Sequence, residues 1–322
     1  MRLRGAASAR ELASALKVSQ PTFSRRVKAM GERVMRLGQG RSTLYALRRV
    51  IEPVGDSWPL YQVDETGTAH RAGVLRALEA GQWAFEAEEP WPSLLGGEPP
   101  GFPLGLFPGL PWFLDDQRPQ GFLGRLFARK YYPVLKADPN LTRWRVDDVV
   151  RAMVLDGEDL PGAWVLGRTA LERMHALKPK PVPAALCPEE YGRLAESALA
   201  GEVGSSAGGE QPKFTACVEK APGEVRYVIV KFSGAGDRPE DGRWRDLLLA
   251  EDWAGKVLRE DNLPAAESSI VQGGGRTFLE SVRFDRVGEK GWFRWPRWMA
   301  RFSGRRRSRG PKWQSVWRKT AG

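Results

Sequence analysis

The sequence predicts an α+β fold that begins with a winged helix-turn-helix. Residues 9–31 show two short helical patterns separated by a tight turn, and residues 34–49 resemble a hairpin about Gly38-Gln39-Gly40. Further along the chain, 214–218 and 225–232 are two strand-like runs around Pro222-Gly223. Helices and strands that follow one another in separate groups are typical of α+β proteins.

Composition restricts the class of protein. Hydrophobic residues make up 42% of the 322 residues and charged residues 28%, which is typical of a soluble globular protein. The apolar runs are too short to cross a membrane, and two cysteines fit a reducing cytoplasm. We expect no metal site, because none of these residues has another ligand at a suitable spacing: His70, His175, Cys187 and Cys217.

Charge is divided unevenly along the chain. Residues 1–50 contain 12 Lys and Arg against 2 Asp and Glu, and residues 290–322 contain 11 Lys and Arg with no acid. Because the formal net charge of the chain is +11, the residues between them are net negative, so only the two ends suit a polyanion. We expect five segments: a winged helix-turn-helix (1–50), a Pro- and Gly-rich connection with short strands (51–104), a subdomain (105–200), a lobe with a glycine-rich loop (201–286) and a Trp- and Arg-rich tail (287–322).

The first segment carries a pattern for DNA binding. Leu12, Ala13 and Leu16 are expected on one face of the first helix, while Ser19 caps a second helix whose Phe23 packs against the first. The order of residues resembles the bacterial helix-turn-helix pattern, except that lysine stands at position 17, where glycine is usual. Short polar side chains can contact base edges and cations can hold phosphates, which predicts a surface for duplex DNA. Its candidate residues are Ser19, Gln20, Thr22, Ser24, Arg25, Arg26, Lys28 and, in the wing, Arg41. The alternative is a helix-turn-helix that serves only dimerisation.

Residues 203–215 form a loop of small residues ahead of the two strand-like runs. Consecutive N–H groups in such a loop can bind phosphate oxygens, although a glycine-rich stretch by itself is more often only a turn. The following strand ends in Lys231, whose charge requires an anionic partner if it is buried. The residues alone leave two interpretations of this loop open, a turn and a phosphate-binding site.

The sequence SSAGGEQPKF, followed by VIVKF, resembles the HipA family of bacterial toxin kinases, and so do FLDDQRPQGFLGR and LESVRFDR. The resemblance covers residues 105–286 and implies a HipA-like subdomain followed by a kinase-like N-lobe. It implies ATP and Mg²⁺ as cofactors, and an aminoacyl-tRNA synthetase as the protein substrate of the intact family member. A fused N-terminal helix-turn-helix is one arrangement found in the family.

The resemblance assigns roles to individual residues. Lys231 corresponds to the strand lysine that contacts ATP phosphates, and Ser206 to the loop serine that is autophosphorylated. Glu251 is a candidate partner of Lys231, as in kinases generally; the alternative is an exposed helix acid. The ATP-binding set is completed by the loop residues Ser205, Ser206, Gly208, Gly209 and Gln211.

The family's catalytic and metal-binding loops have no counterpart in this sequence. No histidine follows His175, and no Asp or Glu follows Glu289. Residues 287–322 hold five of the 13 tryptophans, which we interpret as the product of a frameshift rather than as a segment that binds single-stranded nucleic acid. We therefore expect a kinase that is inactive in phosphoryl transfer. The alternative is a non-catalytic DNA-binding transcriptional regulator.

Overall fold

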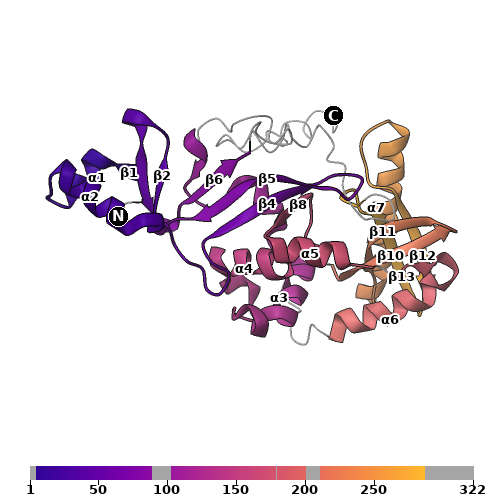
Figure 1. Ribbon diagram of the computed structural model, residues 1–322. Helices are drawn as coiled ribbons and strands as arrows, with labels where there is room; N and C mark the ends of the chain where they lie inside the picture. The colour runs from indigo at the N-terminus through magenta and orange to yellow at the C-terminus, as the bar shows by residue number, and fades with distance from the viewer. Residues whose placement is uncertain (1–4, 89–102, 179, 201–210, 287–322) are drawn as a thin grey trace, which may run out of the picture.

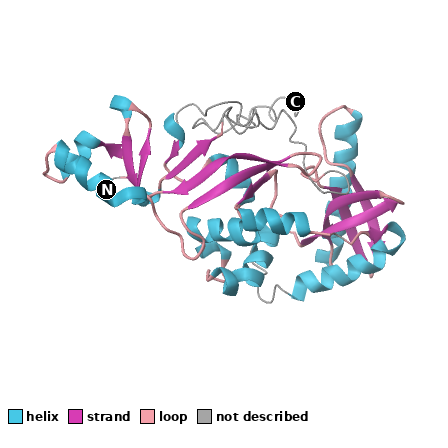
Figure 2. Ribbon diagram, viewed as in Figure 1, coloured by secondary structure: helices cyan, strands magenta, loops and turns pink. Residues whose placement is uncertain are grey.

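The computed structural model describes residues 5–88, 103–178, 180–200 and 211–286. Helices and strands alternate in three bodies, which confirms a mixed α+β architecture (Figure 1). Figure 2 shows a separate sheet in each body. Within the described residues, no helix is both long and apolar enough to span a membrane. The expected tail at 287–322 lies outside the described residues.

The N-terminal body holds two helices against a three-stranded antiparallel sheet in the order β1-β3-β2. Leu12 and Ala13 are buried with Phe23, but the expectation for Leu16 was wrong: the first helix ends one residue earlier and Leu16 is exposed. Lys17 adopts φ +52°, the left-handed conformation for which glycine is usual. The elements are β1 (Ala7–Ser8), α1 (Ala9–Ala15), α2 (Gln20–Met30), β2 (Val34–Leu37) and β3 (Leu44–Leu47).

The middle body is a five-stranded antiparallel sheet in the order β7-β6-β5-β4-β8. Apolar residues from the strands and from α4 form its core around Trp58, Leu75 and Val150. The elements are β4 (Ser57–Val63), β5 (Ala69–Ala77), β6 (Trp83–Ala87), β7 (Leu106–Phe107), α3 (Gly121–Leu135), α4 (Val146–Asp156), β8 (Trp164–Leu166) and α5 (Arg168–Ala176).

This sheet corrects the segment boundary expected at 104/105. Strand β8 comes from the predicted subdomain but pairs with β4 of the predicted connection, at Leu166 and Leu60. Residues 51–104 contribute three strands to this sheet; short strands were expected in the segment, but their pairing with a strand from residues 105–200 was not. The long strand β5 was not predicted.

The C-terminal body is a second five-stranded sheet, in the order β12-β13-β11-β10-β9. Helix α6 covers one face of it, with Tyr191 packed against Phe214 and Phe278. Because α6 packs on this sheet, the boundary expected at 200/201 also moves towards the N-terminus. The elements are β9 (Val182–Pro183), α6 (Cys187–Ala200), β10 (Lys213–Ala221), β11 (Glu224–Phe232), α7 (Pro239–Glu260), β12 (Ser268–Gly273) and β13 (Arg276–Val282).

Candidate functional site

Lys231 of β11 forms an ion pair with Glu251 of α7. Along β11, Val228, Val230 and Phe232 enter the core that α6 covers, so the alternation of a strand directs Lys231 to the opposite face. The carboxylate of Glu251 accepts a hydrogen bond from Lys231 Nζ. The lysine side chain is 26% exposed and the glutamate side chain 47% exposed. The pair is therefore accessible to a ligand, and the ammonium group retains donors for one.

Two buried residues of α7, Leu248 and Asp252, fix the helix on the sheet so that Glu251 lies above β11. Leu248 is completely buried. Asp252 accepts a hydrogen bond of 2.8 Å from Ser268 Oγ of β12 and forms an ion pair of 2.7 Å with Lys256 Nζ. Burial raises the pKa of Asp252, but the hydrogen bonds from Lys256 and Ser268 outweigh it and leave this pKa below its ordinary value. Asp252 is therefore an ionised anchor of the helix.

The glycine-rich loop joins the sheet beside Lys231. Its predicted residues Ser205, Ser206, Gly208 and Gly209 lie outside the described residues, whereas the loop's last residues, Gln211 and Pro212, are described. Lys213 pairs with Lys231 in the strand register, and the Phe232 N–H donates to the Pro212 carbonyl over 3.3 Å. The Nε2 atom of Gln211 is buried and has no acceptor in the described part of the chain. An unpaired amide donor thus lies at the end of the loop that enters beside the lysine.

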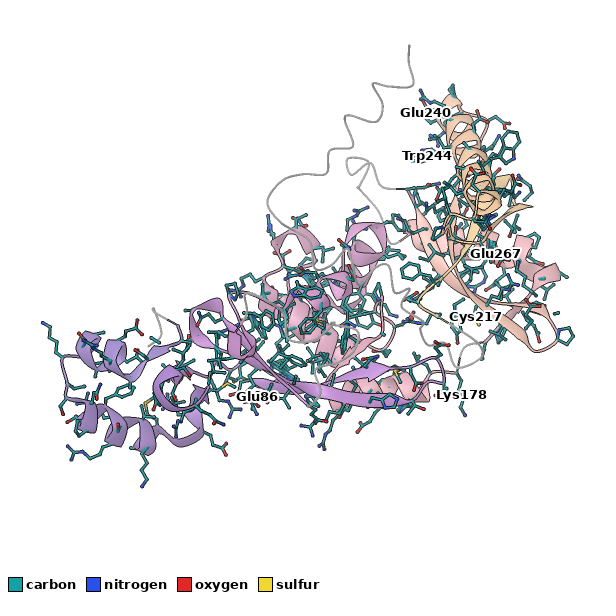
Figure 3. All side chains as sticks on the ribbon, turned by 90° about the horizontal axis from the view of Figure 1, so that it is seen from above. Glu86, Lys178, Cys217, Glu240, Trp244 and Glu267 are labelled. Atoms are coloured by element: carbon teal, nitrogen blue, oxygen red, sulfur yellow. The ribbon has the colours of Figure 1, made fainter. Side chains whose placement is uncertain are left out.

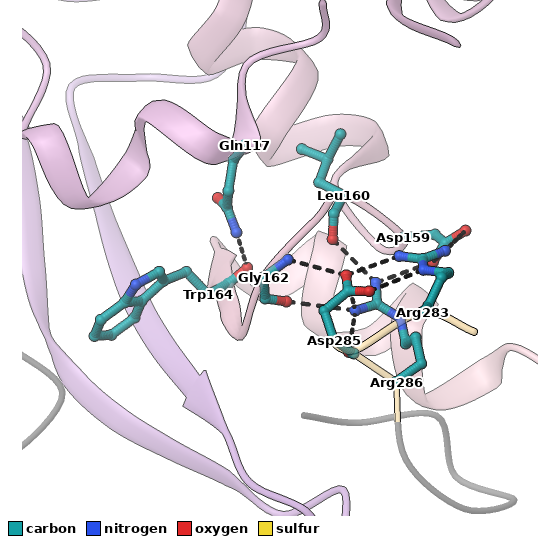
Figure 4. Close-up of polar contacts among 8 residues, drawn as sticks. All are labelled: Gln117, Asp159, Leu160, Gly162, Trp164, Arg283, Asp285 and Arg286. Carbon is teal, nitrogen blue, oxygen red and sulfur yellow. Dashed lines mark hydrogen bonds and ion pairs between the residues drawn. The ribbon is translucent and has the colours of Figure 1, made fainter. Parts of the chain in front are cut away.

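A buried cluster of charges joins the C-terminal sheet to the middle body (Figure 4). Asp285 accepts hydrogen bonds from Arg283 and Arg286, and Arg286 also donates to Asp159 over 3.0 Å. The same Asp285 carboxylate accepts from the Gly162 N–H at 3.1 Å. The side chains of Arg283, Asp285 and Arg286 are 6%, 7% and 2% exposed, so this cluster holds two bodies together.

Charge compensation keeps this cluster ionised. Burial raises the pKa of Asp285, but the two guanidinium groups outweigh burial and leave that pKa below its ordinary value. Sequence reasoning noted Arg283 to Arg286 only as part of a motif and missed the cluster, because Asp159 is 124 residues away from Arg283. A short segment with three charged residues directly after a buried strand was the only local signal.

A cavity of about 740 Å³ lies between the two bodies, beside this cluster. Its walls come from the turn between β4 and β5, the end of α5 and the strands β10 and β11, with Thr68, His175, Lys178, Cys217, Tyr227 and Arg283 among the lining residues. Neither Lys231 nor Glu251 lines it. The cavity and the lysine–glutamate pair are thus separate features of the molecule.

The predicted DNA-binding residues gather on α2. Gln20, Ser24, Arg25, Arg26 and Lys28 are exposed along the helix and at its start. Ser19 and Thr22 form the N-terminal cap of the helix. Ser19 Oγ accepts a hydrogen bond from the Thr22 N–H over 3.3 Å, and the two hydroxyl oxygens are 2.9 Å apart. Arg41 falls in the turn Gly40–Ser42, but its side chain lies outside the described residues.

Comparisons with known proteins indicate the class to which this architecture is related. Residues 54–175, which contain the middle sheet, match the family described as YjjJ-like toxin, middle domain. The chain is also 38% identical over 299 residues to Toxin YjjJ of Escherichia coli (strain K12). The matched region covers 90% of this chain and 63% of that protein, so the chain spans less than two thirds of the relative's length. Both similarities support a relationship to a toxin family.

Proposed function

We propose that this chain combines a DNA-binding winged helix-turn-helix with the phosphate-binding lobe of a HipA-like serine/threonine protein kinase. The observation that carries the kinase assignment is the ion pair between Lys231 on a strand and Glu251 on the next helix. Protein kinases hold ATP phosphates with a lysine in this position, which a glutamate from the following helix orients. An intact toxin kinase of this family would act on a protein substrate, by resemblance an aminoacyl-tRNA synthetase.

The order of elements around the pair supports the same assignment. A hairpin of β10 and β11 precedes α7, and β12 and β13 follow it, with β13 lying between β11 and β12. A strand, a helix and a returning hairpin is the arrangement of a kinase N-lobe. It places the end of the glycine-rich loop beside Lys231, where N–H groups and a cation would act together on phosphate oxygens.

The residues present fit the phosphates of ATP better than they fit its metal ion. Lys231 supplies a cation, and Gln211 supplies an unpaired amide at the end of the loop that enters the sheet. The described residues contain no group of three or more metal ligands, and we assign no Mg²⁺ ligand among them. We expect weak ATP binding and no phosphoryl transfer by the 322-residue chain, because no Asp or Glu follows Glu289 to supply a catalytic loop. The position of Ser206 is the proposed site of autophosphorylation in a relative that has a complete catalytic part.

The N-terminal body supports the DNA-binding part of the proposal. A strand before the two helices, a hairpin after them and the sheet order β1-β3-β2 are the elements of a winged helix. Helix α2 then corresponds to the recognition helix, with Arg25 and Arg26 exposed on it.

Calorimetric titration of the whole chain with ATP, ADP and AMP tests the kinase part. We expect the affinity for the nucleotide to fall as phosphates are removed. Lys231→Met should weaken the binding of ATP more than the binding of AMP. Lys256→Met is a matched control, because Lys256 pairs with Asp252 and not with Glu251. Equal ATP affinity of Lys231→Met and the parent chain would refute the assignment.

Titration of labelled duplex DNA at several salt concentrations tests the other part. Replacing Arg25 and Arg26 by Ala should weaken binding and reduce the slope of log K against log salt by about 1.8, since each lost phosphate contact contributes about 0.9. Arg10→Ala, at an exposed residue of α1, is the control. If the double variant and the parent bind alike at every salt concentration, DNA binding through α2 is excluded. DNA binding without ATP binding would favour the alternative, a non-catalytic transcriptional regulator.

A further inference from the structure

Helix α7 presents an apolar face to solvent on the side away from its sheet. Apart from Asp241, only Leu248 and Asp252 of its 22 residues are buried, whereas Trp253 is 71% exposed. Figure 3 shows α7, marked by Glu240 and Trp244, at the edge of the molecule. The exposed large apolar residues of the helix are Leu247, Leu249, Trp253, Val257 and Leu258. A tryptophan at this exposure within such a patch indicates a surface that another element covers.

The exposed face follows the spacing of a helix that packs against another helix. Six exposed residues are separated alternately by three and four positions, which places them along one stripe: Arg243, Asp246, Ala250, Trp253, Val257 and Glu260. Leu247 and Leu249 flank this stripe on its two sides. The centre is apolar, and charges of opposite sign stand at its ends.

We propose that α7 is a dimerisation helix that packs antiparallel against α7 of a second copy of this chain. In the antiparallel register, Arg243 faces Glu260 of the second copy at both ends of the contact. Ala250 faces Trp253 of the second copy, so that a small residue receives a large one in each central layer. Asp246 lies beside Val257 and the neighbouring Lys256 of the second copy. Charge and size are therefore complementary in one register.

A parallel pair would not have this complementarity. It would place Arg243 on Arg243, Asp246 on Asp246 and Glu260 on Glu260, which brings like charges together in three layers. It would also place the two Trp253 rings in the same layer. The sequence of the stripe thus selects a second copy in the antiparallel orientation. This inference goes beyond the proposed function and does not depend on nucleotide or DNA binding.

Sedimentation of the full chain over a range of concentrations tests the proposal. We expect a reversible dimer that Trp253→Glu converts to a monomer, with unchanged far-ultraviolet circular dichroism because the residue is exposed. Leu186→Glu, at an exposed leucine away from α7, is the matched control and should leave the dimer intact. A parent chain that is monomeric at every concentration would overturn the proposal, and so would a dimer that Trp253→Glu does not affect.

A charge exchange tests the register itself. Arg243→Glu and Glu260→Arg should each weaken the dimer by about tenfold or more, because each places like charges together twice. An equimolar mixture of the two single variants should dimerise again, since every contact then joins unlike charges. The two positions are about 25 Å apart along one helix, so no contact within a chain gives this rescue. If the mixture dimerised no more tightly than either variant alone, the antiparallel register would be excluded.

Discussion

Two groups of paired charges lie in the same C-terminal body and differ in their exposure to solvent. Lys231 and Glu251 are 26% and 47% exposed, whereas Arg283, Asp285 and Arg286 are all less than a tenth exposed. In the exposed pair, the strand lysine keeps its contact with the helix glutamate and remains open to solvent on another side. Each charge of the buried cluster is held by several hydrogen bonds.

The difference assigns separate tasks to the two groups. An exposed ion pair contributes little to stability, about 0–1 kcal/mol, so its partners can be retained for binding. Removing one member of a buried cluster leaves charges without compensation and strongly destabilises the fold. The exposed pair is therefore consistent with the proposed role of Lys231 in phosphate binding, whereas the buried cluster at Asp285 connects the two bodies.

The largest effect is expected from Asp285→Asn. The neutral side chain leaves two buried guanidinium groups without their shared carboxylate, and we expect a loss of about 3–5 kcal/mol in the free energy of unfolding. Urea unfolding followed by tryptophan fluorescence measures it. Asp159→Asn, whose side chain is 52% exposed, is the matched control and should cost much less. Equal losses in the two variants would mean that burial does not distinguish them.

A smaller effect is expected when pH is lowered. The pKa of Asp285 lies below its ordinary value of 3.8 in the folded protein. Its contribution to stability is therefore present above pH 3.8 and is lost as pH falls through the lower folded-state pKa. The parent chain should lose stability more steeply than Asp285→Asn in this range. If the free energy of unfolding fell equally steeply with pH in the two proteins, other carboxylates would account for the acid transition.

The smallest effect is expected for Glu251→Gln. Because the pair with Lys231 is exposed, the free energy of unfolding should change by about 1 kcal/mol or less. The same urea experiment measures it, with Asp252→Asn on the same helix as a control, which should cost more because Asp252 is buried and bonded to Ser268. A loss from Glu251→Gln as large as that from Asp252→Asn would make the pair structural.

Short-range signals allowed the sequence to predict much of the N-terminal body. The cap at Ser19 and the packing of Phe23 depend on residues within a few turns of each other, and both predictions were confirmed. Lys17 occupies the position at which glycine was expected, and its φ of +52° agrees with that expectation. The error at Leu16 arose because a helix end cannot be placed to one residue from periodicity alone.

Long-range pairings were beyond the reach of the sequence pattern. The pairing of β4 with β8 joins segments about a hundred residues apart, so the boundary at 104/105 was misplaced. Contact between Asp159 and Arg286 spans 127 positions. The ion pair between Lys231 and Glu251 was left open for the same reason: a helical acid has no local mark of its partner. The resemblance to kinases, rather than any periodicity, supplied that candidate.

Urea unfolding with and without ATP tests the division between the two groups most directly. A ligand that binds only the folded state adds about 1.4 kcal/mol at a concentration about tenfold above its Kd. We predict that Lys231→Met keeps the ligand-free stability of the parent and loses the increase with ATP. Asp285→Asn should lose ligand-free stability and keep the increase. If Lys231→Met retained the full increase with ATP, the proposed role of Lys231 in phosphate binding would be contradicted.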